Sequence, residues 1–519
     1  MTDPVLLTDD QMQHFIAHGF LRLQTQLPES FHQRMFEQFD YFIGGEVSRD
    51  PGNNLLPAVP DLEQVFADPV VRGAITSVIG PDYAMHPHRV LHNNAPGSAA
   101  QAMHKDSYWG FTRRVRNHRL RWVMIMYVPQ ATAAERGPTG VIPGSQYLMQ
   151  KPDEAIMPEV AGALAAGGFL LIHYDIWHRK MKNFTMDKRF MAKFEFIRMH
   201  APTAPTWDHR DVSWRLVDLP GADLSAIWKR QWHWLLGRDI SGSPTPAHGA
   251  TAHLADPDVR IRLQAVNQIA GAGADAIRTA LPALASLLRA SNEQVAVDAA
   301  YAMAGCGQSA IPALRAAFAN GDGEDTEGDN VGHGASVRDL STIVRCAAHG
   351  LVEVGVPAVP ALLDLLSTSA PRGRKHAAFA LGEVASNELV VADALCSAAK
   401  DAEPGVRINA VEALGLKTAT PSIVAALATP SIVAALSEAI HDSDAHVRFS
   451  AALSLAQIGP GAEAAVPALS EALHDDNRYV PGYAVEALER IASPQAMQTL
   501  IRFLKTSRWC PHTNSSSIF

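Results

Sequence analysis

The second half of the chain, from about residue 250 onward, is built from one repeated phrase. Runs of the type Ala-x-x-Leu-x-x-Ile-Gly recur, as in QAVNQIAGAG, NAVEALGLKT and SAALSLAQIG. The pairs Val406-Arg407 and Val447-Arg448 open two successive copies, about forty residues apart. Short Ala- and Leu-rich helices cannot bury their apolar faces alone, so pairs of them must stack on one another. The repeat therefore predicts an all-α solenoid.

This half resembles HEAT repeats of the short bacterial kind, in about six or seven copies. We expect a first domain over residues 1–240, a Gly/Pro/Ser linker over 241–252, the solenoid over 253–505 and a tail over 506–519. The repeats contain no catalytic constellation. The resemblance therefore implies an interaction role: binding a protein partner, self-association, or capping a substrate.

Composition excludes several classes of protein. With 44 basic and 53 acidic residues the net charge is −9, which gives no overall footprint for nucleic acid. The most apolar stretches, 160–177 and 421–435, are broken by polar residues, Gly or Pro, so no membrane span is expected. The start lacks the charged and apolar regions of a secretory signal, and four cysteines without a CxxC fit reduced thiols. We expect a cytoplasmic protein without a membrane or nucleic-acid partner.

The first half changes from a helical to a strand-like pattern. Residues Asp9 to His18 form an amphipathic run that ends at Gly19, which predicts a helix. Short β-rich runs follow at 121–128, 168–174 and 189–197. Strands after a helical start indicate a β-sandwich or barrel flanked by helices.

The phrase Met103-His104-Lys105-Asp106 carries the clearest chemistry. Residues i and i+2 of an extended segment point to the same side, so His104 and Asp106 can reach one point. His178 follows an apolar strand later in the chain. Two histidines and one carboxylate on one face of an octahedron form the usual centre of non-haem Fe(II) oxygenases.

A strand that begins at Arg189 supports this interpretation. Along 189–197 the phenylalanines occupy one face, while Arg189, Lys193 and Glu195 share the other. Arginine suits a bidentate grip on a carboxylate. A keto acid that chelates iron at one end and carries a carboxylate at the other would need such a residue.

The first half resembles the phytanoyl-CoA dioxygenase family of iron and 2-oxoglutarate-dependent oxygenases. Four motifs agree in order and spacing: LTDDQMQHFIAHGFLRL, MHKDSYW, GPTGVIPGSQY and GGFLLIHYDIWHRKMKNFTMDKRF. The resemblance implies an α+β domain with a double-stranded β-helix, of the jelly-roll or cupin-like type. It also implies Fe(II), 2-oxoglutarate as co-substrate, O2, and a small-molecule substrate that is hydroxylated.

The resemblance assigns roles to five positions. It implies His104, Asp106 and His178 as catalytic iron ligands, Arg189 as the residue that binds the distal carboxylate of 2-oxoglutarate, and Trp122 as an aromatic on the co-substrate side. The family's Pro-Gly-Ser-His loop ends here in Gln146, a departure that does not affect the metal ligands. Halogenating relatives lack the carboxylate, so Asp106 favours hydroxylation.

Substrate contacts are expected beside the ligands, at Tyr108 and Trp109 and in a run of five arginines from Arg113 to Arg121. The arginines can bind an anionic substrate, and Arg113 and Arg121 are candidates for this. They can equally contact solvent or the acidic second half. His86, His88 and His92 are interpreted as pocket wall or structural residues.

Two other functions stay open. The chain can be a scaffold or interaction protein whose oxygenase-like domain is inactive, although the complete set of ligand candidates argues against this. The repeats can also carry a separate lyase-like activity. No cysteine lies in a recognisable electropositive setting, which disfavours that activity.

Overall fold

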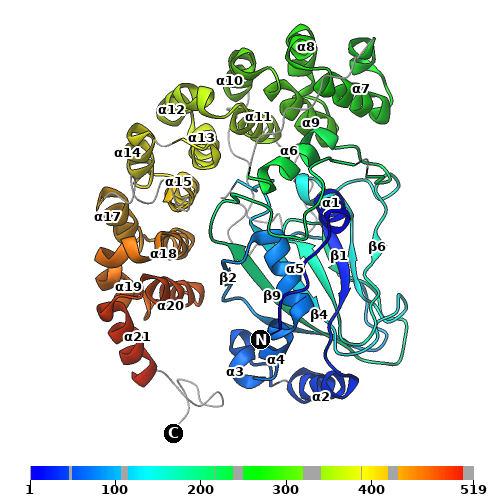
Figure 1. Cartoon of the computed structure of the whole chain (residues 1–519), viewed down its shortest axis with the longest axis vertical. Coiled ribbons are helices and arrows are strands. Elements are labelled where there is room, and N and C mark those ends of the chain that lie inside the picture. The colour runs from blue at the N-terminus through cyan, green and yellow to red at the C-terminus, as the bar shows by residue number, and fades with distance from the viewer. Residues whose placement is uncertain are drawn as a thin grey trace.

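The chain folds into a sheet-centred first half and a helical second half that curves around one side of it (Figure 1). A computed structural model describes residues 2–45, 49–106, 115–215, 217–237, 249–319, 341–386, 388–418 and 430–506. The expected linker lies mostly outside these ranges, so the domain boundaries remain predictions.

Two antiparallel sheets form the first half. The larger follows the order β1-β7-β4-β9-β2, with β3 also paired to β9, and the smaller follows β6-β5-β8. The strands are β1 (Phe20–Gln24), β2 (Tyr83–Met85), β3 (Val90–Asn94), β4 (Trp122–Tyr127), β5 (Thr139–Val141), β6 (Val160–Ala161), β7 (Gly168–His173), β8 (His178–Lys180) and β9 (Arg189–Arg198). The three strands expected from the sequence are confirmed as β4, β7 and β9.

The strand β9 shows how the sheets enclose a polar interior. Its Phe190 and Phe194 rings pack edge-on against Phe36 and Phe66, with ring centroids 5.1 and 4.5 Å apart, so helices cover that face. The opposite face looks toward the smaller sheet, because the Thr139 hydroxyl of β5 accepts a hydrogen bond from the first residue of β9. The cupin-like arrangement is therefore the predicted one.

Helices flank the large sheet. The first helix runs from Asp9 to His18 and ends at Gly19, whose φ of +78° favours glycine, as the sequence predicted. Thr8 and Gln11 close a capping box at its start. The helices of this half are α1 (Asp9–His18), α2 (Glu29–Phe39), α3 (Leu55–Ala58), α4 (Leu62–Ala67), α5 (Pro69–Ile79) and α6 (Ser225–Leu235).

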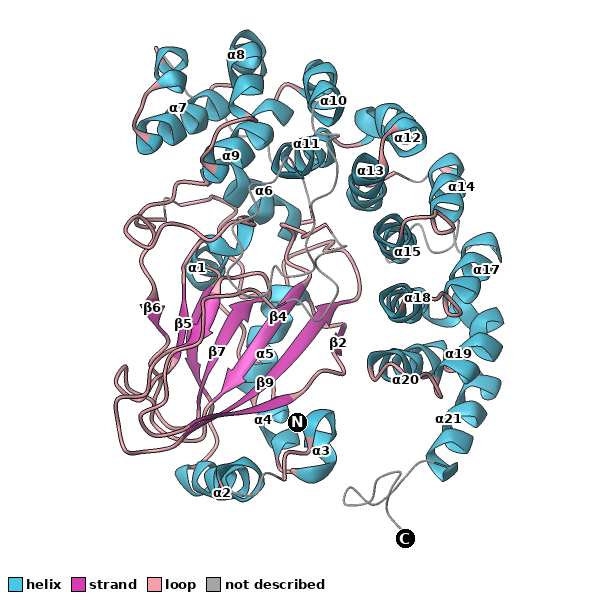
Figure 2. Cartoon of the chain, turned by 180° about the vertical axis from the view of Figure 1, so that it is seen from behind, coloured by secondary structure: helices cyan, strands magenta, loops and turns pink. Residues whose placement is uncertain are grey.

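The second half is a solenoid of helix pairs. An inner row faces the sheets: α7 (Val259–Gly271), α9 (Glu293–Ala304), α11 (Ser341–Val354), α13 (Pro371–Glu383), α15 (Pro404–Thr418), α18 (Ala445–Ile458) and α20 (Tyr479–Ile491) (Figure 2). An outer row completes the pairs: α8 (Ala274–Leu287), α10 (Ile311–Ala319), α12 (Val359–Thr368), α14 (Leu389–Ala398), α17 (Pro430–Ala439), α19 (Val466–Ala472) and α21 (Pro494–Thr506).

Small residues allow neighbouring inner helices to approach closely. A Cβ atom on Gly382 of α13 would lie 2.7 Å from the Cβ of Ala413 on α15. This contact explains the scarcity of bulky residues in the repeats. Among the described helices, none is both long and apolar enough to cross a membrane.

Buried charges join the inner row to the first half. The carboxylate of Glu383 on α13 accepts hydrogen bonds from Nε and Nη2 of Arg121, at 3.0 and 2.9 Å, and from Nη1 of Arg119 at 3.2 Å. Further along the row, Glu293 of α9 accepts the backbone N–H groups of Met149 and Gln150, both at 2.8 Å. These groups are desolvated, so each depends on its partner across the interface.

Histidines at this interface are expected to make stability sensitive to acid. His118 stacks on His349, with ring centroids 3.7 Å apart, and burial holds the pKa of both, and of His376, well below the usual value. Below about pH 6.5 these histidines bind protons in the unfolded chain but not in the folded chain. Each histidine therefore lowers the free energy of unfolding by up to about 1.4 kcal/mol per pH unit.

Urea unfolding at pH 7.5 and pH 5.5 checks this expectation. The midpoint should fall on acidification, and it should fall less in a His376→Gln variant, which has one fewer buried imidazole. An unchanged wild-type midpoint would show that these histidines gain protons without unfolding.

Candidate active site

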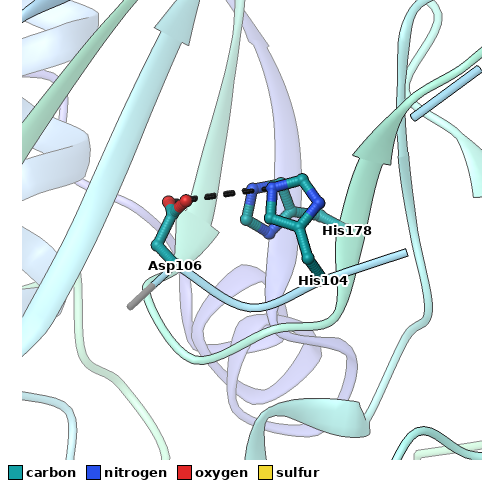
Figure 3. Close-up of side chains that lie close together, drawn as sticks. All are labelled: His104, Asp106 and His178. Atoms are coloured by element: carbon teal, nitrogen blue, oxygen red, sulfur yellow. Dashed lines mark ion pairs between the residues drawn. The ribbon is translucent and has the colours of Figure 1, made fainter. Parts of the chain in front are cut away.

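His104, Asp106 and His178 converge on one point (Figure 3). One ligand atom from each lies within 4.8 Å of the others. The carboxylate of Asp106 lies 3.9 Å from Nε2 of His104 and 3.7 Å from Nε2 of His178. The two histidines are held together by their backbones, because each N–H donates to the other's carbonyl, at 3.0 and 2.9 Å. This bridge places two imidazoles beside the carboxylate, although they are far apart in sequence.

Backbone carbonyls fix how the imidazoles face. Nδ1 of His104 lies 2.9 Å from the carbonyl of Ala102, and Nδ1 of His178 lies 3.1 Å from that of Ile176. Donation from Nδ1 leaves Nε2 with its lone pair directed at the shared point, as metal binding requires. The sequence did not identify these orienting groups, because any residue provides a carbonyl.

The protonation states also suit a divalent cation. Burial lowers the pKa of His178 to about 4, so its imidazole is neutral at pH 7. Burial alone would raise the pKa of Asp106, but the nearby charge of Lys193 and its hydrogen bond bring it well below its usual value. Two imidazoles and a carboxylate are the ligand set expected for non-haem iron.

Lys193 is a neighbour of the ligands that the motifs did not indicate. Its Nζ lies 3.1 Å from Oδ2 of Asp106 and 3.7 Å from the carboxylate of Glu195. The alternating pattern of β9 places Lys193 and Glu195 on the polar face with Arg189. This alternation is the sequence feature that could have indicated Lys193. Their distance from Asp106 could not be read from the sequence, since it depends on how the segment that carries Asp106 packs against β9.

Arg189 lies buried at the start of β9, with 2% of its surface exposed. Its Nη2 donates to the Thr139 hydroxyl at 3.0 Å. Burial lowers its pKa to about 10, so the guanidinium stays charged at pH 7. Among the described residues, no hydrogen-bond acceptor serves its Nε and no carboxylate pairs with it. A buried cation of this kind fits an anionic ligand.

Two family models match the chain. The model for phytanoyl-CoA dioxygenase matches residues 33–191, and the model for HEAT repeats matches residues 338–415 and 392–480. The chain carries a phytanoyl-CoA dioxygenase domain and HEAT repeats. The iron-ligand candidates and Arg189 all lie within the matched dioxygenase residues.

Several solved structures are similar in part. The non-haem monooxygenase ThoJ is 16% identical, with a TM-score of 0.31, over 44% of this chain and 95% of ThoJ. EctD from S. alaskensis with bound Fe is 15% identical, with a TM-score of 0.32, over 38% of this chain and 79% of EctD. HygX from Streptomyces hygroscopicus is 12% identical, with a TM-score of 0.30, over 41% and 96%. No curated protein sequence matches the chain.

The register of the dioxygenase domain does not support the role expected for Trp122. Trp122 pairs with Ile197, whereas Arg189 pairs with Asn94 at the other end of β9. Eight residues of strand span roughly 26 Å, so the two side chains cannot both contact one small keto acid. Trp122 instead packs against His86, with ring centroids 5.5 Å apart.

The candidate substrate residues divide into two groups. Tyr108, Trp109 and Arg113 lie outside the described residues. Arg121 is buried with its guanidinium on Glu383 of the HEAT repeats. The structure therefore favours the alternative interpretation of Arg121, a contact with the acidic second half, over substrate binding.

Proposed function

We propose that the chain is a non-haem iron oxygenase that couples oxidative decarboxylation of 2-oxoglutarate to hydroxylation of a small organic substrate. The observation that carries the proposal is the convergence of His104, Asp106 and His178 on one point inside the domain. The buried guanidinium of Arg189, which has no carboxylate partner among the described residues, supports it independently.

Each residue then has a defined task. His104, Asp106 and His178 would hold Fe(II), with Nδ1 of each imidazole kept on its backbone carbonyl. Arg189 would bind the distal carboxylate of 2-oxoglutarate, and Lys193 would hold the Asp106 carboxylate in place. When bound, the iron supplies the point at which the keto acid and O2 react to yield succinate and CO2 as the substrate is oxidised.

Anaerobic Fe(II) with 2-oxoglutarate tests the proposal. The weak visible absorption of the iron chelate should appear with wild-type protein and be absent with His104→Ala. Succinate should form when O2 is admitted. If the wild-type protein gives neither the band nor succinate, the chain is better described as a scaffold with an inactive domain.

The role of Arg189 gives a second expected result. An Arg189→Lys variant keeps the positive charge but loses the two parallel N–H donors. The 2-oxoglutarate concentration that gives half of the maximal chelate absorption should therefore rise about 10- to 100-fold. Arg22→Lys is the control, since that side chain is exposed on β1 and donates to the carbonyl of Ala161. Equal half-saturation in Arg189→Lys and wild type would mean that another group binds the distal carboxylate.

A reactive thiol in the repeats receives no support. Burial raises the pKa of Cys346 to about 12, and also raises the pKa of Cys306 and Cys396. These described cysteines are free thiols. A raised pKa disfavours the thiolate needed for lyase-type chemistry. Buried free thiols fit the reducing compartment we propose for the protein, the cytoplasm.

A further inference from the structure

The last inner helix of the solenoid, α20, lies against the edge of the large sheet (Figure 1). At one end of the contact, Nη1 of Arg490 donates to the carboxylate of Asp82 at 2.8 Å, and Nη2 donates to the carbonyl of Tyr83 at 3.3 Å. An edge strand exposes unpaired backbone groups and needs a cover. The helix α20 gives β2 that cover.

The approach of α20 is unusually close at one residue. A Cβ atom on Gly482 would lie 2.4 Å from Cγ and 2.7 Å from Cβ of Pro87. Proline is rigid, so any larger residue at this position would push the helix away from the segment that follows β2. The fit indicates that α20 is seated at a fixed position.

Two tyrosines beside this glycine hold two histidines of the dioxygenase domain. The Tyr483 hydroxyl is hydrogen-bonded to Nδ1 of His86, a residue with no exposed surface. The Tyr479 hydroxyl lies 3.2 Å from Nδ1 of His88, and its ring stacks on that of His86 with centroids 5.3 Å apart. Tyr479, Gly482 and Tyr483 occupy one face of α20.

These histidines lead directly to the proposed iron ligands. Nε2 of His86 lies 3.8 Å from the Glu195 carboxylate, which lies 3.7 Å from Lys193, which in turn contacts Asp106. Burial, as the main cause, lowers the pKa of His88 to about 3, which leaves its imidazole neutral.

We propose that α20 positions side chains beside the proposed iron site, with Tyr479 and Tyr483 as positioning residues that fix His86 and His88 next to the contacts of Glu195 and Lys193 with Asp106. The inference rests on the proposed function. It gives the HEAT repeats a part in the activity of the oxygenase.

Spectroscopy of the full-length protein tests the positioning role. Fe(II) and 2-oxoglutarate are loaded anaerobically, occupancy is set equal by the chelate band, and nitric oxide is added as a stand-in for O2. The electron paramagnetic resonance signal should change in shape in Tyr479→Phe and Tyr483→Phe. Gly482→Leu, which displaces the helix, should change it further.

Tyr301→Phe is the matched control. It removes another phenol–imidazole contact between the two halves, the 3.0 Å bond between the Tyr301 hydroxyl and Nδ1 of His118. Among the described residues, the ring neighbours of His118 are Tyr147, Tyr301 and His349. Its signal should match that of the wild type. If the signals of Tyr479→Phe and Tyr483→Phe also match, the positioning role is wrong. A missing chelate band in wild-type protein would instead overturn the proposed function itself.

Discussion

Replacement of His178 by alanine is expected to leave the protein without bound iron and to reduce 2-oxoglutarate decarboxylation at least about 100-fold, since altering even a residue that only supports a metal ligand costs 10- to 100-fold. The side chain's own hydrogen bond is local, to the carbonyl of Ile176, so the fold should persist. Elemental analysis for iron and a succinate assay on the same preparation measure both effects.

His173 provides the control, since it lies five residues before His178, at the end of the apolar strand that precedes His178. It pairs with Val123 and therefore faces the other side of the sheet from Met124 and Glu195. Its Nδ1 accepts the backbone N–H of Asp175 at 3.0 Å. His173→Gln should retain iron. The reverse pattern, with iron lost at His173 and kept at His178, would reassign the ligand.

The largest effect on stability is expected at the interface between the halves. Glu383→Ala removes the only carboxylate that pairs with the buried guanidinium of Arg121 among the described residues, and one of the two carboxylates that pair with the partly buried Arg119. Breaking a buried ion pair in this way costs about 3–5 kcal/mol. Urea unfolding followed by circular dichroism should show a lower first midpoint, with the two halves unfolding in separate steps.

Glu438→Ala is the comparison. Its carboxylate lies 2.6 Å from Nζ of Lys400, but both side chains are more than half exposed. An exposed pair contributes at most about 1 kcal/mol, so this variant should unfold almost as the wild type does. Equal destabilisation by the two variants would show that burial of Glu383 does not matter.

The sequence predicted those features that depend on neighbouring residues. The first helix, the three apolar strands and the helix pairs follow from local periodicity and capping, because each residue's burial there is set by residues a few positions away. The candidate iron ligands were predicted from motifs whose order reflects the fold. The structure brings the three side chains together, and their binding of iron stays a prediction.

The contacts between the halves could not be read from the sequence. Arg121 and Glu383 are separated by 262 residues, and their pairing depends on the curvature accumulated over several repeats. The arginine run therefore left both substrate binding and contact with the repeats open. Trp122 was misplaced for a related reason, since motif spacing does not give the register of β4 on β9.

The solenoid contacts the dioxygenase domain along its inner row, from Glu293 of α9 and Glu383 of α13 through Asn409 of α15 to Arg490 of α20. A free HEAT array can gain or lose a repeat and remain a working array. Here the number of repeats between α9 and α20 determines where α20 lies on the dioxygenase domain. One repeat more or fewer would carry Tyr479 and Tyr483 past the histidines they meet, so we expect changes of repeat number to be confined to the ends of the array.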